Sequence, residues 1–93
     1  MKITIWTTQE NLANLIGAEL KEIYNELNQW AFDVSIFNSW DEPFYVSNWI
    51  DVNTDSFKIE PNYWLTIKIF SQNFDKVRLV SQNNGTNAKV LIT

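Results

Sequence analysis

The spacing of the apolar residues changes once along the chain, and this change restricts the fold more than any other feature of the sequence. From position 12 to position 30 apolar residues recur three or four positions apart, which places them on one face of an α-helix. This stripe predicts a helix of roughly 22 residues, about 33 Å long at 1.5 Å per residue. Thr7 and Glu10 match the capping box that begins many helices. The stripe consists of Leu12, Leu15, Ile16, Leu20, Ile23, Leu27 and Trp30.

After Trp30 the apolar residues alternate with polar ones, the two-residue period of a β-strand with one buried face. Short segments of turn composition separate the strands, and Asn84-Gly85 predicts a tight hairpin because both residues tolerate positive φ. We therefore expect an α+β fold and a single domain over residues 1–93. In it, one long N-terminal helix packs on an antiparallel sheet of about five to six strands, a two-layer sandwich. The main expected strands are Met1–Trp6, Phe32–Phe37, Phe44–Val52, Tyr63–Phe70, Val77–Ser81 and Ala88–Ile92.

The composition excludes several classes of chemistry. The chain has 93 residues, no Cys and no His, so it can form neither a disulfide nor a nucleophile paired with an imidazole. Two glycines are too few for a phosphate-binding loop or a dinucleotide fingerprint. We expect a non-catalytic protein that needs no cofactor. Because no disulfide can stabilise the fold, we expect the 5 Trp, 6 Phe and 3 Tyr to supply much of the volume of the core.

Charge is distributed unevenly along the chain. The segment from Glu22 to Phe57 contains no Lys or Arg, yet it holds seven carboxylates and nine of the 14 aromatic residues. Aromatic side chains anchor interfaces, and carboxylates steer the approach of a positively charged partner. This acidic, aromatic segment therefore predicts a surface that binds a basic partner protein, such as a nucleic-acid-binding protein. Its carboxylates are Glu22, Glu26, Asp33, Asp41, Glu42, Asp51 and Asp55.

Within this segment, the turn that follows the first post-helical strand combines a Trp with two acids and two further aromatic residues. An exposed patch of this kind invites association. In the alternative, Trp40 and Phe44 fold inward and close one end of the sandwich. The predicted protein-binding residues are Trp40, Asp41, Glu42, Phe44, Tyr45, Trp49, Asp51 and Asp55.

Part of the same segment resembles the opening of a calcium loop. Asp51, Asn53 and Asp55 place oxygen ligands at alternate positions. The match then fails, because Ser56 stands where the sharp turn requires Gly and Asn62 stands where a bidentate Glu belongs. We expect an ordinary turn here and no metal site.

The predicted function is that of an inhibitor or immunity-type protein, or of a phage accessory protein, working in the cytoplasm without contact with a membrane. The alternative is a structural subunit of a viral particle or a homo-oligomer, and a carbohydrate-binding module that stacks sugars on Trp40 and Trp49 is a weaker third. Direct nucleic-acid binding is not expected, because the net charge is −4. The basic residues of the C-terminal third, with Trp64 and Phe70, would form at most a weak single-strand platform. They are Lys68, Lys76, Arg78 and Lys89.

Overall fold

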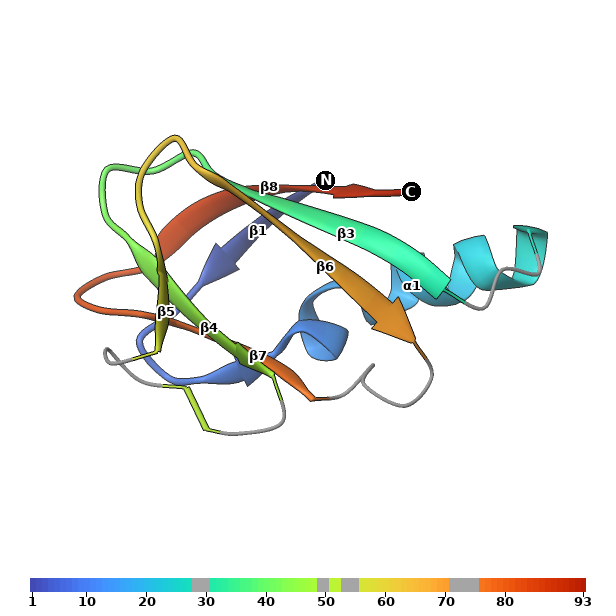
Figure 1. Ribbon diagram of the computed structural model, residues 1–93, viewed down its shortest axis with the longest axis horizontal. Helices are drawn as coiled ribbons and strands as arrows, with labels where there is room; N and C mark the ends of the chain where they lie inside the picture. Colours follow the sequence, from blue (N-terminus) through green and yellow to red (C-terminus); the bar gives the residue numbers. More distant parts are fainter. Residues whose placement is uncertain (28–30, 49–50, 53–55, 71–75) are drawn as a thin grey trace.

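The computed structural model describes residues 1–27, 31–48, 51–52, 56–70 and 76–93, with residues 23–27 described by their backbone alone. In these residues the chain forms eight strands and one helix (Figure 1). In chain order they are β1 (Lys2–Ile5), β2 (Glu10–Asn11), α1 (Leu12–Leu27), β3 (Ala31–Asn38), β4 (Phe44–Asn48), β5 (Phe57–Ile59), β6 (Trp64–Phe70), β7 (Val77–Ser81) and β8 (Thr86–Ile92).

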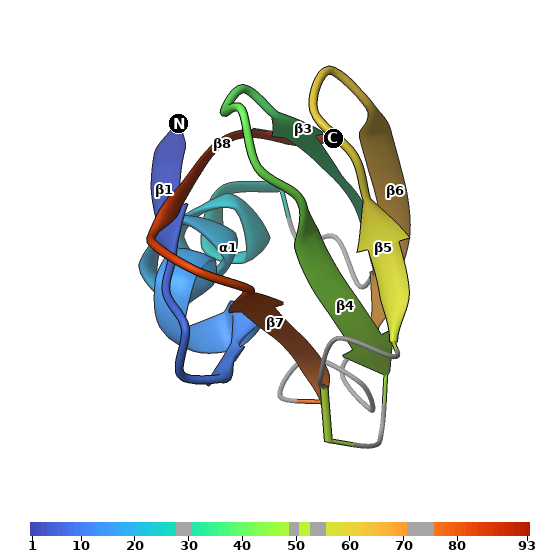
Figure 2. The same cartoon turned by 90° about the vertical axis from the view of Figure 1, so that its left-hand side faces the viewer.

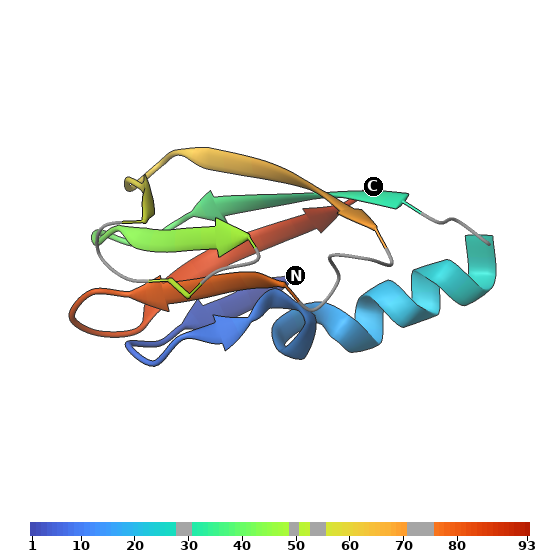
Figure 3. The ribbon, with the colours of Figure 1, turned by 60° about the horizontal axis from the view of Figure 1, so that its bottom comes forward.

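As far as the chain is described, the strands form two antiparallel sheets of four strands each. One sheet has the order β1-β8-β3-β6 and the other the order β2-β7-β4-β5. The two sheets curve around a shared interior, and α1 lies at the end of the molecule opposite the β7–β8 turn (Figures 2 and 3). The first and last strands are neighbours, because β1 pairs with β8 in the register Lys2 to Lys89.

The main apolar core joins the inner faces of both sheets to α1. In β3, buried Phe32, Val34 and Ile36 alternate with partly exposed residues, as the two-residue period requires. In β6, Leu65, Ile67 and Ile69 face this core, and Thr66 and Lys68 are exposed. The helix contributes Leu12, Ile16 and Leu20, which are one turn apart and buried. These contacts confirm the inward residues of the predicted strands Phe32–Phe37 and Tyr63–Phe70 and the first half of the apolar helix stripe.

The predicted fold class, one long helix on a single sheet, is wrong. The chain is mostly β, and its helix has 16 residues, or about 24 Å, too short to cover the apolar faces of all the strands. Each sheet covers the inner face of the other instead. The six main predicted strands correspond to β1, β3, β4, β6, β7 and β8, although β4 ends at Asn48 and β2 lies where the helix start was predicted, and these strands form two sheets. Ile23, Leu27 and Trp30 lie outside the residues whose side chains are described.

Two local predictions also fail. Glu10 does not cap α1, because it belongs to β2 and pairs with Leu79, so the helix begins at Leu12. Asn84-Gly85 does lie in the turn between β7 and β8, but these strands belong to different sheets and neither residue has positive φ. Gly85 leaves room for a neighbouring ring there: a Cβ atom on it would lie 2.8 Å from the Trp6 ring, so a larger residue would require the ring to shift.

Candidate functional site

Three connections lie together at the end of the molecule that faces the viewer in Figure 2, away from α1. They are residues 39–43 between β3 and β4, residues 60–63 between β5 and β6, and residues 82–85 between β7 and β8. We call this region the loop end. Backbone hydrogen bonds tie the first two connections, because Asn62 N–H donates to the Asn38 carbonyl at 2.9 Å and Asn38 N–H donates to the Tyr63 carbonyl at 3.0 Å.

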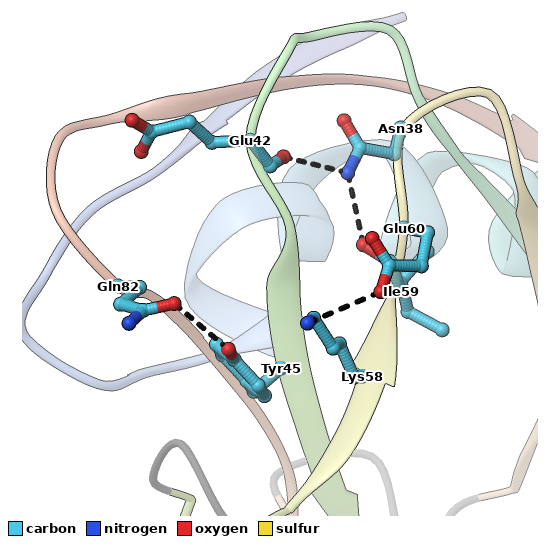
Figure 4. Close-up of polar contacts among 7 residues, drawn as sticks. All are labelled: Asn38, Glu42, Tyr45, Lys58, Ile59, Glu60 and Gln82. Atoms are coloured by element: carbon cyan, nitrogen blue, oxygen red, sulfur yellow. Dashed lines mark hydrogen bonds and ion pairs between the residues drawn. The ribbon is translucent and has the colours of Figure 1, made fainter.

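The side chain of Asn38 organises the loop end from beneath (Figure 4). It is fully buried, and its Nδ2 donates to the carbonyls of Glu42 at 2.8 Å and Ile59 at 2.9 Å. Its Oδ1 accepts a hydrogen bond from Trp40 N–H at 3.0 Å. One buried amide therefore fixes both ends of the 39–43 turn and joins it to β5, because all three contacts require the same side-chain orientation.

The β7–β8 turn is attached to the same structure by hydroxyl groups. Tyr45 Oη donates to Gln82 Oε1 at 2.9 Å, as Figure 4 shows. The Thr86 hydroxyl, which is buried, contacts the Ser81 hydroxyl at 2.9 Å and donates to the Pro43 carbonyl at 3.4 Å. All three connections are thus held by hydrogen bonds to the sheets or to each other, so the residues they expose are presented in a defined arrangement.

The loop end exposes aromatic rings next to carboxylates. Trp40 is 44% exposed and Tyr63 is 65% exposed. Asp41 and Glu60 are exposed beside them, and Glu42 is half-buried. Three acids against Lys58 alone give these residues a formal charge of −2.

Two of the charged groups have further contacts. Glu60 lies 3.1 Å from the Lys58 ammonium, and the hydrogen bond between them raises the pKa of Lys58 above its ordinary value of 10.5. One carboxylate oxygen of Glu42, Oε2, is buried and has no hydrogen-bond partner in the described part of the chain. Asp41 and Glu60 are therefore the carboxylates that a partner can reach.

The structure brings together only part of the predicted site. Trp40, Asp41 and Glu42 share the 39–43 turn at the loop end. Phe44 is fully buried in the core, and Tyr45, 4% exposed, packs with Val52 and Val80. The sequence left two alternatives for this turn: an exposed patch, or Trp40 and Phe44 folded inward. Phe44 is folded inward, whereas Trp40 is partly exposed.

The other predicted residues do not join the loop end. Asp51 is exposed beside β7, where its carboxylate accepts hydrogen bonds from Gln9 at 3.3 Å and Arg78 at 3.4 Å. Trp49 and Asp55 lie outside the described residues, as does most of the calcium-like segment. The described residues contain no group of three side chains suited to hold a metal ion.

Sequence reasoning missed Asn38, Glu60 and Tyr63. Asn38 had a recognisable signal, because it occupies an inward position in the two-residue period of β3, where a polar side chain must find hydrogen-bond partners. Tyr63 was placed in a strand, although it follows Pro61 and Asn62. Asn62 has a φ of 69°, a conformation that Asn adopts more readily than most residues.

Comparison with known proteins gives no relative from which a role could be transferred. No protein-family model matches the chain, and no curated protein and no solved structure matched it. Within the described residues, no helix has the length and apolar character needed to cross a membrane.

Proposed function

We propose that this chain is a non-catalytic binding protein that places its loop end on a basic surface of a partner protein. The observation that carries the proposal is Trp40, an exposed Trp on a turn whose geometry the buried Asn38 amide fixes. Trp residues are frequent hot spots of protein interfaces. A rigid turn also lowers the entropy lost on binding, because its conformation is already set.

The acids around Trp40 support a basic partner. Asp41 and Glu60 flank the exposed rings, and rim charges of this kind raise association rates with an oppositely charged surface. The proposal keeps the class of protein predicted from the sequence, an inhibitor or immunity-type protein of a bacterium or phage. It narrows the contact surface from the whole acidic segment to Trp40, Asp41, Glu60 and Tyr63.

The test compares two charge-reversal variants. Asp41→Lys with Glu60→Lys changes the loop end, and Glu19→Lys with Glu22→Lys makes the same change of four charges on the exposed side of α1. Affinity capture with each variant and the original chain from the native cell, followed by mass spectrometry, identifies proteins lost only with the loop-end variant. With such a protein purified, we expect its association rate to fall about tenfold or more for that variant alone, and less at high salt.

Trp40→Ala provides an independent measurement on the same complex. If Trp40 is a hot spot worth about 2 kcal/mol, its removal accelerates dissociation roughly 30-fold. Equal binding by the original chain, the loop-end charge variant and Trp40→Ala would refute the proposal. Light scattering on the purified chain separates it from the structural-subunit alternative, which requires a stable homo-oligomer.

A further inference from the structure

The outer face of the β1-β8-β3-β6 sheet differs in charge from the rest of the chain. Lys2, Lys89, Phe37 and Trp64 are directly opposite one another in the strand registers, so they form one row across all four strands. With strands about 4.8 Å apart, this row spans about 14 Å. Lys2 and Lys89 are exposed, Trp64 is 58% exposed, and the rings of Phe37 and Trp64 have centroids 4.8 Å apart. We call these four residues the lysine–aromatic row.

The two lysines of the row face each other without compensation. Like charges directly opposite on neighbouring strands are destabilising. Within the described residues, neither Lys2 nor Lys89 forms an ion pair. The one carboxylate that the described residues place on this face, Asp33, lies 2.8 Å from Lys68 instead. The lysine pair is therefore free to bind an anion.

A depression of about 500 Å³ lies beside this lysine pair. Its lining includes Thr4, Ser39, Trp40 and Asn87 together with the two lysines. Thr4 Oγ1 donates to Asn87 Oδ1 at 3.2 Å, which fixes the amide. One half of the row is therefore cationic and lies beside a hollow, at Lys2 and Lys89. The other half is aromatic and exposes the Trp64 ring.

We propose that the lysine–aromatic row binds single-stranded nucleic acid, with phosphates at Lys2 and Lys89 and a base stacked on Trp64. Single strands repeat a negative charge and a flat ring at every unit, and proteins bind them by combining basic groups with stacking aromatic residues. An acidic peptide would match the lysines but offers no ring at every repeat. The inference reverses the expectation drawn from the net charge, because Asp33 is paired with Lys68 and leaves Lys2 and Lys89 uncompensated.

Two lysine contacts give a measurable salt dependence. Each phosphate contact to a single strand contributes a slope of about 0.7 in log affinity against log salt. Two contacts predict roughly sevenfold weaker binding at 200 mM than at 50 mM salt, and one contact predicts a weakening of roughly 2.6-fold. Because the overall charge opposes binding, we expect dissociation constants of about 1–100 μM at 50 mM salt.

The experiment is fluorescence anisotropy of labelled oligothymidylate and oligouridylate, each of about 12 nucleotides, titrated with the whole chain. Lys89→Gln should weaken binding and reduce the salt dependence to the single-contact value, and Trp64→Ala should weaken binding roughly 5- to 100-fold. The matched controls are Lys21→Gln on α1 and Phe57→Ala on β5, both exposed and on other surfaces, which should bind as the original chain does.

Thermal unfolding of Lys89→Gln distinguishes a binding role from a structural one. Removing one of two opposed ammonium groups should leave the melting temperature unchanged or raise it while binding falls. A lower melting temperature would assign Lys89 a structural role and contradict the inference. So would the absence of oligonucleotide binding at 50 mM salt, or equal binding of polyglutamate, which would indicate a site for acidic proteins. Asp41→Lys with Glu60→Lys should not weaken oligonucleotide binding. The nucleic-acid site and the proposed protein interface can therefore be refuted separately.

Discussion

Replacing Asn38 by alanine should destabilise the protein more than any other single change at the loop end. The substitution removes three hydrogen bonds of 2.8 to 3.0 Å, two of which are donated to the carbonyls of Glu42 and Ile59. At about 0.5–1.5 kcal/mol for each bond, the expected loss is about 3 kcal/mol of unfolding free energy. A chain of 93 residues typically has about 5–14 kcal/mol in total. Thermal and urea unfolding measure the loss, which corresponds to a melting temperature lower by roughly 12–24 °C.

Two further variants separate the hydrogen bonds from the effects of volume and composition. Asn38→Asp keeps the shape but cannot donate to two carbonyls, so it should destabilise at pH 7 at least as much as alanine and regain stability as acid protonates the carboxyl. Asn14→Ala, an exposed position on α1, should change stability by no more than about 0.5 kcal/mol.

A loss below about 1 kcal/mol for Asn38→Ala would show that the 39–43 turn does not depend on this amide. Trp40 would then not be held in a fixed position, and the proposed interface would lose its main support.

Two other substitutions test the core and the β7–β8 turn. Leu20→Ala removes a side chain that is 3% exposed on the inner face of α1, and chemical denaturation should show a loss of about 2–5 kcal/mol. Gly85→Ala should cost about 1–3 kcal/mol in the same assay, because its Cβ would lie 2.8 Å from the Trp6 ring and 2.9 Å from a Thr4 methyl group; an unchanged stability would show that Trp6 moves aside freely.

Several strands were predictable because only one of their faces is buried. The alternation of Phe32, Val34 and Ile36 with polar or half-exposed residues gave β3, and Leu65, Ile67 and Ile69 gave β6 with its inward side correct. Such patterns reflect the pleat of a single strand, which the local sequence determines. They predict which side of a strand is buried, but not which other strand lies beside it.

The arrangement of the strands was not predictable by the same reasoning. Val77–Ser81 and Thr86–Ile92 are separated by a short turn, yet they pair with different sheets. Where this turn begins, the N–H of the buried Ser81 donates to the Trp6 carbonyl at 2.8 Å. That bond joins residues 75 positions apart, and no local pattern contains it.

The candidate site was predictable in part for a related reason. The sequence placed Trp40, Asp41 and Glu42 in a turn, where they are found. The local sequence could not show which aromatic residues are exposed. Phe44 and Tyr45 come shortly after Trp40, but Phe44 packs in the main core and Tyr45 packs against Val52 and Val80. Tyr63 joins the loop end through a hydrogen bond from Asn38 N–H to its carbonyl, and Glu60 follows Ile59, whose carbonyl accepts from the Asn38 side chain; Asn38 lies more than 20 residues earlier.

The pairing of β1 with β8 has a consequence for the order of events during synthesis. Lys2 pairs with Lys89, so β1 acquires its neighbour only after 87 further residues have been added. At about 5–20 residues per second, the ribosome needs roughly 4–17 s for this, and closing so long a loop also slows folding afterwards. During that interval Ile3 and Ile5, which are buried in the finished protein, have no sheet to join. Until then the apolar side of β1 is open to aggregation, and β1 can join its sheet only when β8 has been synthesised.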